Sequence, residues 1–279
     1  MISVAEALSG ATKRLRQRES ARADALLFLE YALGRPRAWI AAYGETPLSP
    51  DALATFQTMC ARRDAGTPAA YVVGSAGFYG REFVVNESVL IPRSETEHLV
   101  DDAIAFIGDA RARVLDVGTG SGAIACTIAA RTNAWVDATD ISTAALEVAT
   151  HNAARLGVAE RCRFHHGDLA EPVKHATFDV LIANLPYVPS RDVPRRPDPI
   201  AFEPRLALDG GVDGLACYRR LAGDLPALLE ARALGLFEAA PPTVAGLGEL
   251  LASTLRGFAI SVHRDYAGLE RYVRAERRR

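Results

Sequence analysis

Three stretches near the start of the chain place apolar residues at the spacing of one helical face. They cover residues 2–17, 23–33 and 50 to about 65, and Gly34 follows the second of them. Apolar side chains that recur every three or four residues line one side of a helix. A glycine directly after such a pattern is typical of a helix end. The sequence therefore predicts a small helical bundle over residues 1–66.

The spacing changes after Thr67-Pro68. Residues 71–74 and 82–85 are rich in aromatic and β-branched side chains, and a glycine-containing turn lies between them at 77–80. Two such runs around a turn predict a β-hairpin. We expect this hairpin, within residues 67–92, to link the bundle to the rest of the chain.

From residue 93 to the end, strand-like and helix-like segments alternate. We expect strands at 114–117, 134–139, 162–165, 178–183, 235–239, 258–262 and 270–273, and helices at 95–107, 123–130, 142–156, 215–229 and 243–255. Short continuous apolar runs are typical of strands buried on both faces of a parallel sheet, and their alternation with helices indicates an α/β fold. The predicted domain, residues 93–279, holds one open seven-stranded sheet whose last two strands form a hairpin.

The first strand of this sheet runs into a glycine-rich turn. The turn consists of Gly118, Thr119, Gly120, Ser121 and Gly122, and an alanine-rich helix follows it. The order strand, glycine turn, helix presents backbone N–H groups to a nucleotide-like ligand, because glycine allows the ligand to approach the backbone closely. The spacing fits neither G-x-G-x-x-G nor a Walker loop. A tight connection without a ligand is the alternative.

Asp140 ends the next predicted strand. A carboxylate at this place can accept two hydrogen bonds from a ribose diol. The same residue could instead be only the N-cap of the helix that begins at Ser142. Together, the glycine turn and the acid favour an adenosine ligand.

The predicted strand at 178–183 ends in Asn184, Leu185, Pro186 and Tyr187. An asparagine and an aromatic residue that flank a proline lie here at the carboxyl end of a central strand, where open α/β sheets place their chemistry. The arrangement resembles motif IV of the S-adenosylmethionine-dependent methyltransferases that alkylate planar amide or amine nitrogens. A plain strand-ending turn is the alternative.

Two further segments of the sequence border this predicted site. Ser94 can cap the helix at 95–107, with Glu97 in the capping-box position, or the segment 91–97 can form a loop over the ligand. Residues 189–199 are rich in proline and arginine, and we interpret them, with the stretch up to residue 208, as a substrate lip.

Composition narrows the function. The 279 residues are 49% hydrophobic and 24% charged, which is ordinary for a globular protein. A formal net charge of −2 gives no basic field that would recruit nucleic acid. The four cysteines form no C-x-x-C pair, so we expect reduced thiols in a cytoplasmic protein and no metal site. We also expect neither a signal peptide nor a membrane span.

Several stretches together resemble the glutamine-N5 methyltransferases of peptide chain release factors, the HemK/PrmC family. The resemblance is carried by Ile-Pro-Arg-Ser-Glu-Thr-Glu at 91–97, Glu-Pro-Arg-Leu-Ala-Leu at 203–208, Gly-Val-Asp-Gly-Leu at 211–215 and the Asn-Leu-Pro-Tyr motif. It implies a class I methyltransferase fold, a Rossmann-like seven-stranded sheet with a small N-terminal helical bundle joined by a β-hairpin. It also implies translation termination as the setting, with a monomeric enzyme, a release factor as partner and no nucleic-acid substrate.

The resemblance implies roles for particular residues. The donor would be bound by Gly118–Gly122, by Asp140 at the ribose, by Asp168 at the adenine amino group and by Leu169 against the ring, with Asn184 near the methionine moiety. The acceptor would be the glutamine of a Gly-Gly-Gln motif. Its amide would donate to the Asn184 side-chain oxygen and to the Leu185 carbonyl, and Tyr187 would stack on it.

The sequence departs from the family pattern at three places. Leu185 and Ser94 replace prolines, and residues 228–242 lack the usual glycines and glutamine. We expect activity to survive the first change, because a carbonyl is present in either case and the following Pro186 keeps the backbone extended. Asn-Leu-Pro-Tyr also occurs in ribosomal-RNA adenine dimethyltransferases. A DNA or RNA adenine methyltransferase is therefore one alternative, and a non-catalytic binding module is another.

Overall fold

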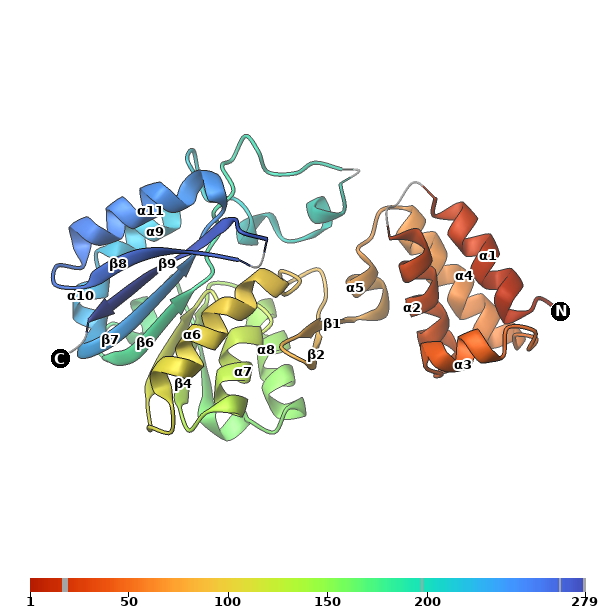
Figure 1. Cartoon of the computed structure of the whole chain (residues 1–279), viewed down its shortest axis with the longest axis horizontal. Helices are drawn as coiled ribbons and strands as arrows, with labels where there is room; N and C mark the ends of the chain where they lie inside the picture. The colour runs from red at the N-terminus through yellow and green to blue at the C-terminus, as the bar shows by residue number, and fades with distance from the viewer. Residues whose placement is uncertain (17–19, 197, 266, 278–279) are drawn as a thin grey trace. The chain divides into compact units, whose positions relative to one another are not determined.

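The computed structural model describes residues 1–16, 20–196, 198–265 and 267–277 (Figure 1). The chain divides into two compact units. One contains Met1–Gly74 and Arg195–Phe202, and the other contains Ser75–Pro194 and Glu203–Arg279. Each unit has its own buried apolar core. Within the described residues no helix is long and apolar enough to cross a membrane.

The first unit is a helical bundle. Its helices are α1 (Val4–Arg14), α2 (Ala21–Leu33), α3 (Arg37–Ala42), α4 (Pro50–Asp64) and α5 (Ala69–Val73). The three predicted helices correspond to α1, α2 and α4, although Gln17, in the first prediction, lies outside the described residues. Phe28 and Leu29 of α2 and Phe56 of α4 fill the core, as the apolar spacing predicts.

The strand prediction for residues 71–74 is wrong. These residues form most of α5, which begins after Pro68 and ends at Gly74 in the left-handed conformation. Val72 is buried in the core of the bundle. This packing outweighs the β-propensity of Tyr-Val-Val, which is a weak local preference.

The hairpin itself begins later than predicted. Strand β1 (Ser75–Phe78) pairs with β2 (Arg81–Val84), and the register joins Phe78 to Arg81. The two-residue turn is Tyr79-Gly80, with φ of 51° and 69°. Positive φ at both turn positions matches the right-handed twist of a hairpin. Asn152 of α8 (Thr143–Arg155) ties the hairpin to the second unit, because its side chain bonds both the N–H and the C=O of Val84.

The second unit contains the predicted seven-stranded sheet. Its strands are β3 (Arg113–Val117), β4 (Trp135–Asp140), β5 (Cys162–His166), β6 (Phe178–Ala183), β7 (Leu229–Glu238), β8 (Ala259–Arg264) and β9 (Glu270–Arg277), in the order β5-β4-β3-β6-β7-β9-β8. The first five strands are parallel, and β9 is antiparallel to β7 and β8. The strand order reverses between β3 and β6, and ligands of open α/β sheets bind at such a point.

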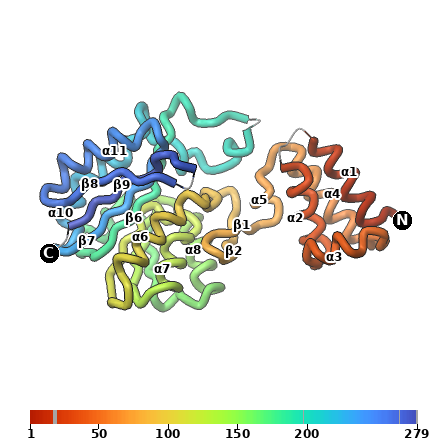
Figure 2. Tube along the Cα trace, in the orientation of Figure 1, coloured from red at the N-terminus to blue at the C-terminus, as the bar shows by residue number. Residues whose placement is uncertain are grey.

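Helices cover both faces of the sheet (Figure 1). One face packs against α6 (Glu97–Ile107), α7 (Ala123–Arg131) and α8, and the other against α9 (Ala216–Ala222), α10 (Leu225–Leu228) and α11 (Pro241–Thr254). Figure 2 shows α11 lying along β8 and β9. Alternate residues of β3 enter the two cores, Val114 on one side and Leu115 on the other, as the period of a strand requires.

The helix predicted at 215–229 is shorter than expected. It is divided into α9 and α10, and β7 begins at Leu229. The first half of β7 is polar and exposed at Glu230 and Arg232, so it lacks the apolar signal of a buried strand. Arg277 of β9 donates to the carbonyl oxygens of Glu230 and Ala231 and holds this segment extended.

Candidate active site

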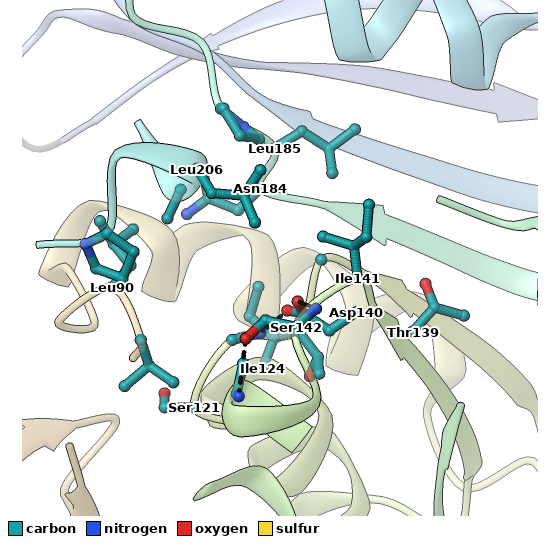
Figure 3. A pocket seen from close by; sticks show the side chains of 18 of the residues that line it. Leu90, Ser121, Ile124, Thr139, Asp140, Ile141, Ser142, Asn184, Leu185 and Leu206 are labelled. Atoms are coloured by element: carbon teal, nitrogen blue, oxygen red, sulfur yellow. Dashed lines mark hydrogen bonds between the residues drawn. The ribbon is translucent and has the colours of Figure 1, made fainter. Parts of the chain in front are cut away.

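A pocket opens at the carboxyl ends of β3, β4 and β6 (Figure 3). Ten of the residues predicted for the site line it: Gly118, Thr119, Gly120, Ser121, Asp140, Asp168, Leu169, Asn184, Leu185 and Pro186. Gly122 and Tyr187 were also predicted but are not among the lining residues. The structure thus brings together residues that are spread over almost 70 positions of the sequence.

The glycine turn leaves bare backbone toward the pocket. Gly118, Gly120 and Gly122 all have positive φ, between 55° and 77°. A Cβ atom on Gly120 would meet nothing within 4 Å, whereas one on Gly122 would lie 3.0 Å from the Ala149 Cβ atom of α8. Gly120 therefore leaves space in front of the turn, and Gly122 allows α7 and α8 to pack closely.

The buried residue Asp116 holds the glycine turn through hydrogen bonds. Asp116 accepts hydrogen bonds from the Thr119 hydroxyl at 2.6 Å and from the Ala125 N–H at 3.2 Å. Burial raises the pKa of Asp116 to about 7, and these two hydrogen bonds oppose that rise.

Asp140 connects the glycine turn to the next loop. Its Oδ2 atom accepts the Gly120 N–H at 2.9 Å, and its Oδ1 atom accepts the Ser142 N–H at 2.9 Å. The N-cap of α8 is Ser142, whose hydroxyl accepts the Ala145 N–H. The alternative that Asp140 caps this helix is therefore wrong. A carboxylate has about four acceptor positions, so Asp140 retains acceptor capacity in the pocket that it lines.

Asp168 has a partner that sequence reasoning missed. Arg220 of α9 forms an ion pair with the Asp168 carboxylate, and both residues line the pocket. Arg220 follows Asp168 by 52 residues, so no local pattern connects them. Leu169 has φ of 49°, which is rare for a residue with a side chain. Such strained conformations cluster at ligand sites.

Two loops with the family-like motifs meet above the pocket. Leu90, Pro92, Arg93 and Thr96 line it from one loop, and Pro204, Leu206 and Ala207 line it from the other. Glu203 joins them, because its carboxylate accepts from Arg93 and from the Ile91 N–H. Pro92, Arg93 and Thr96 thus place this segment at the pocket, and its position over a bound ligand stays a prediction.

The capping-box prediction for Ser94 is wrong. Residues Ser94–Thr96 form a short 3-10 turn before α6, and the Ser94 hydroxyl donates to Glu95. Glu97 accepts the Tyr79 N–H of the hairpin instead of capping its own helix. A long-range contact has replaced the local one that the sequence pattern suggests.

The predicted lip lies only partly at the pocket. Its stretch at 204–207 contributes lining residues. Arg195 and Arg196 belong to the compact unit of the helical bundle. Arg191 is exposed and pairs with its neighbour Asp192 at 3.4 Å.

Asn184 is held by a chain of hydrogen bonds. Its Nδ2 atom lies 3.1 Å from the Thr96 hydroxyl, which lies 2.7 Å from Oε2 of Glu238. The Tyr187 hydroxyl donates to Oε1 of Glu238 at 3.2 Å. Sequence reasoning missed Thr96 and Glu238. A signal was present, since Glu238 ends the otherwise apolar run Gly235-Leu236-Phe237 and is only 1% exposed.

Burial changes the acidity of this group of residues. It raises the pKa of Glu238 to about 7, against the lowering effect of the hydrogen bonds from Thr96 and Tyr187. Burial also raises the pKa of the Tyr187 phenol above its ordinary value. The phenol therefore keeps its proton at neutral pH and remains a donor to Glu238.

Tyr218 of α9 fixes the backbone around Asn184. Its hydroxyl accepts the Leu185 N–H at 3.2 Å and lies within donor distance of the carbonyl oxygens of Ala183 and Glu238, which share its one proton. Tyr218 thereby contacts the residues before and after Asn184 and also joins the end of β6 to the end of β7.

Leu185 occupies a fitted position. Its side chain is buried, and a Cβ atom on Gly118 would lie 3.0 Å from its Cδ2 atom. The leucine thus packs against the glycine turn, and Pro186 follows it as in the predicted motif.

An open sheet that reverses between β3 and β6, with a pocket at that point lined by the glycine turn, Asp140 and Asn184, is the architecture of a class I methyltransferase. Two family descriptions match the chain, "PrmC N-terminal domain" over residues 6–74 and "Methyltransferase small domain" over residues 97–195. The fold class and the family expected from the sequence are both confirmed.

Curated relatives identify the family. The release factor glutamine methyltransferase of Bacillus subtilis is 36% identical over 98% of this chain and 97% of its own length. That of Bordetella pertussis is 40% identical over 90% of this chain and 93% of its own length. The chain therefore belongs to the release factor glutamine methyltransferase family. A methyltransferase structure from Pyrococcus furiosus has a TM-score of 0.53 at 16% identity, covering 72% of this chain and 90% of that one, and shares the fold.

Proposed function

We propose that Asn184, Leu185, Pro186 and Tyr187 form the site in which the glutamine of a release factor is methylated. The chain is an S-adenosylmethionine-dependent protein-glutamine methyltransferase, as its family is. The observation that carries the site assignment is the position of Asn184, in the same pocket as the glycine turn and Asp140. Donor and acceptor groups would meet there.

The pocket residues fit the methyl donor. Gly120 leaves open space against bare backbone, where donor atoms can approach. Asp140 has spare acceptor capacity for a ribose diol, and Asp168 and Leu169 line the same pocket for an adenine. When bound, S-adenosylmethionine supplies an electrophilic methyl group on a sulfonium. These assignments explain why the turn and both acids lie at one end of the sheet.

The protein's contribution is to position a poor nucleophile. The lone pair of a glutamine amide is delocalised, so the nitrogen must be held in a fixed plane. The Asn184 Oδ1 atom and the Leu185 carbonyl oxygen would each accept one N–H of the substrate amide. Their negative dipole ends would also stabilise the positive charge that grows on nitrogen as the C–N bond forms and the C–S bond of the sulfonium breaks, with its electron pair left on sulfur. The remaining contribution is proximity to the methyl group.

Tyr187 does not line the pocket, and its hydroxyl donates to Glu238. We retain stacking on the substrate amide as part of the proposal, because Tyr187 directly follows Pro186, which does line the pocket. The bond to Glu238 would then fix the ring in place.

We also propose a division of labour along the chain. Residues 1–66 would dock the release factor, 67–92 would link, and 93–279 would carry out the transfer. The independent core of the bundle supports a separate role for it. The hairpin within the linker is bound to α8 through Asn152, so it acts as part of the transferase unit.

The proposal includes a protein substrate in the cytoplasm, a monomeric enzyme and no nucleic-acid substrate. The net charge of −2 supports a protein acceptor, because base-flipping enzymes need a basic groove for phosphates. Release factor, ribosomal RNA and duplex DNA should be offered together with labelled donor. Mass spectrometry should find the label on the glutamine of the Gly-Gly-Gln motif. Label only on adenine would support the alternative function.

A further inference from the structure

The side chain of Asn184 has two possible orientations, and they differ in chemistry. With Oδ1 toward the acceptor, the carboxamide accepts an N–H of the substrate. With Nδ2 there, it presents a donor to a group that is itself a donor. If Asn184 binds the acceptor amide as proposed above, the residues around it must select the first of these two orientations.

The number of protons available to the hydrogen bonds between Glu238, Thr96 and Asn184 selects one orientation of the Asn184 carboxamide. A carboxylate only accepts, so the Thr96 hydroxyl must donate its single proton to Oε2 of Glu238, 2.7 Å away. Its oxygen can then only accept from Asn184, and the Nδ2 atom lies 3.1 Å from it. This donation places Nδ2 at Thr96 and leaves Oδ1 on the other side of the carboxamide.

The reversed orientation would be costly. If Oδ1 faced Thr96, the hydroxyl would have to donate to Asn184, and Oε2 of Glu238 would lose its partner. Glu238 is 1% exposed and Thr96 is 4% exposed, so water would not replace the lost bond freely. A buried polar group without a partner is strongly unfavourable.

We propose that Glu238, acting through the Thr96 hydroxyl, is a positioning residue that holds the Asn184 carboxamide with its oxygen toward the methyl-accepting amide. Glu238 is at the end of β7, and Thr96 is in the turn before α6. Their hydrogen bond therefore joins the loop that carries Thr96 to the central sheet. Neither residue needs to touch the substrate for this role.

The groups around Glu238 determine the pH at which its hydrogen bond with Thr96 can change direction. Thr96 and Glu95 face it from the turn before α6, Tyr187 from the segment after β6, Arg271 from β9 and Tyr218 from α9. Burial raises the pKa of Glu238 to about 7, while Arg271 and the two hydrogen bonds lower it. A protonated Glu238 can donate to the Thr96 hydroxyl. That hydroxyl can then donate to Asn184, so the direction of both hydrogen bonds can reverse. Turnover should therefore fall as the pH drops below about 7.

Substitutions at Thr96 test the hydrogen-bonded link between Glu238 and Asn184 and leave the buried Glu238 in place. Thr96→Val keeps the shape but has no hydroxyl, and Thr96→Ser keeps the hydroxyl. We expect Thr96→Val to lower kcat about 30-fold to 100-fold, since misplacement of a reacting group can cost about 10² in rate. We expect its Kd for S-adenosylmethionine to stay within about twofold. Thr96→Ser should stay within about threefold of the parent kcat.

The pH profile separates positioning from a merely structural role. The parent and Thr96→Ser should lose kcat between pH 8 and pH 6, and the residual activity of Thr96→Val should be flat over that range. Glu238→Gln should also flatten the profile. Thr127→Val is a matched control, since Thr127 is buried in α7 and its hydroxyl has no partner among the described residues. It should keep parental kcat and pH dependence.

Two results would overturn the proposal. One is a Thr96→Val enzyme with kcat within about threefold of the parent, and the other is a Thr96→Ser enzyme as slow as Thr96→Val. Thermal unfolding of each variant checks that it is folded, and the Thr96 pair is decisive even if Glu238→Gln does not fold. Failure of the parent to methylate release factor glutamine would instead contradict the proposed function.

Discussion

The Glu203 carboxylate binds both the guanidinium of Arg93 and the backbone N–H of Ile91, 110 and 112 residues earlier in the chain. The Glu203 side chain is 2% exposed and the Arg93 side chain is 32% exposed, so the carboxylate is buried while the guanidinium reaches solvent. The two loops that cover the pocket are thereby held as one structure, and a change at Glu203 should affect both.

We predict that Glu203→Ala weakens donor binding and lowers stability. It removes the hydrogen bonds that the carboxylate accepts from the partly buried Ile91 N–H and Arg93 guanidinium, and the loss of a hydrogen bond to a charged group costs about 1.5–3 kcal/mol. Calorimetry with S-adenosylmethionine and thermal unfolding measure the two effects. Arg191→Ala is the control, because Arg191 is exposed and its ion pair among the described residues is with its neighbour Asp192. Equal behaviour of the two variants would show that the Glu203 bonds do not order the pocket.

Asp140→Ala should weaken the binding of S-adenosylmethionine. The loss of charge-assisted bonds to a ribose diol should cost about 1.5–3 kcal/mol. The variant also loses the bonds that Asp140 accepts from Gly120 and Ser142, so part of the effect would come from a looser glycine turn. Asp140→Asn can keep some of these acceptors and should bind with intermediate affinity. An unchanged affinity of Asp140→Ala for the donor would remove this residue from the ribose role.

Asn184→Ala should abolish transfer and leave donor binding mostly intact. Loss of one group from a preorganised polar site typically costs about 10²–10³ in rate. Donor affinity rests on the glycine turn, Asp140 and Asp168, which the substitution leaves in place. Single-turnover methylation of release factor, followed by mass spectrometry, gives the rate. A variant that keeps more than about a tenth of the parent rate contradicts the mechanism.

Deletion of residues 1–74 should separate binding from methylation of the protein substrate. The deletion removes the core of the bundle and stops before the hairpin, which is anchored in the other unit. The shortened enzyme should bind S-adenosylmethionine with parental affinity and methylate intact release factor poorly. A short Gly-Gly-Gln peptide should be a similar substrate for both enzymes. Full activity of the shortened enzyme on intact release factor would show that the bundle is not a docking domain.

The sequence is sufficient for the parts of the fold that depend on local pattern. The strand at 178–183 and the glycine turn were predicted because apolar runs and glycine spacing report burial and backbone shape directly. The helix over residues 69–73 was missed because its conformation is decided by packing in the bundle. Ser94 failed as a cap because Glu97 bonds to the distant Tyr79 instead.

The site was predictable only where a motif lies within one stretch of chain. Asn184 and Asp140 follow strands and are visible by that position. Arg220 and Glu238 contribute through partners 52 and 142 residues away, at Asp168 and Thr96, and no spacing rule connects such pairs. In the sequence, Glu238 is visible only as an acidic residue at the end of an apolar strand. This position indicates a buried carboxyl group but does not indicate which residue binds it.

Asn152 gives the hairpin an influence on the donor site. Its Nδ2 atom donates to Ser121 O at 2.9 Å and to Val84 O at 3.0 Å, so one side chain joins the glycine turn to β2. Order in the hairpin and order in the turn are consequently coupled. The chain enters the hairpin directly from Gly74, the last residue of the bundle. A substitution that disturbs β2 is therefore expected to reach the backbone of the glycine turn through the buried amide of Asn152.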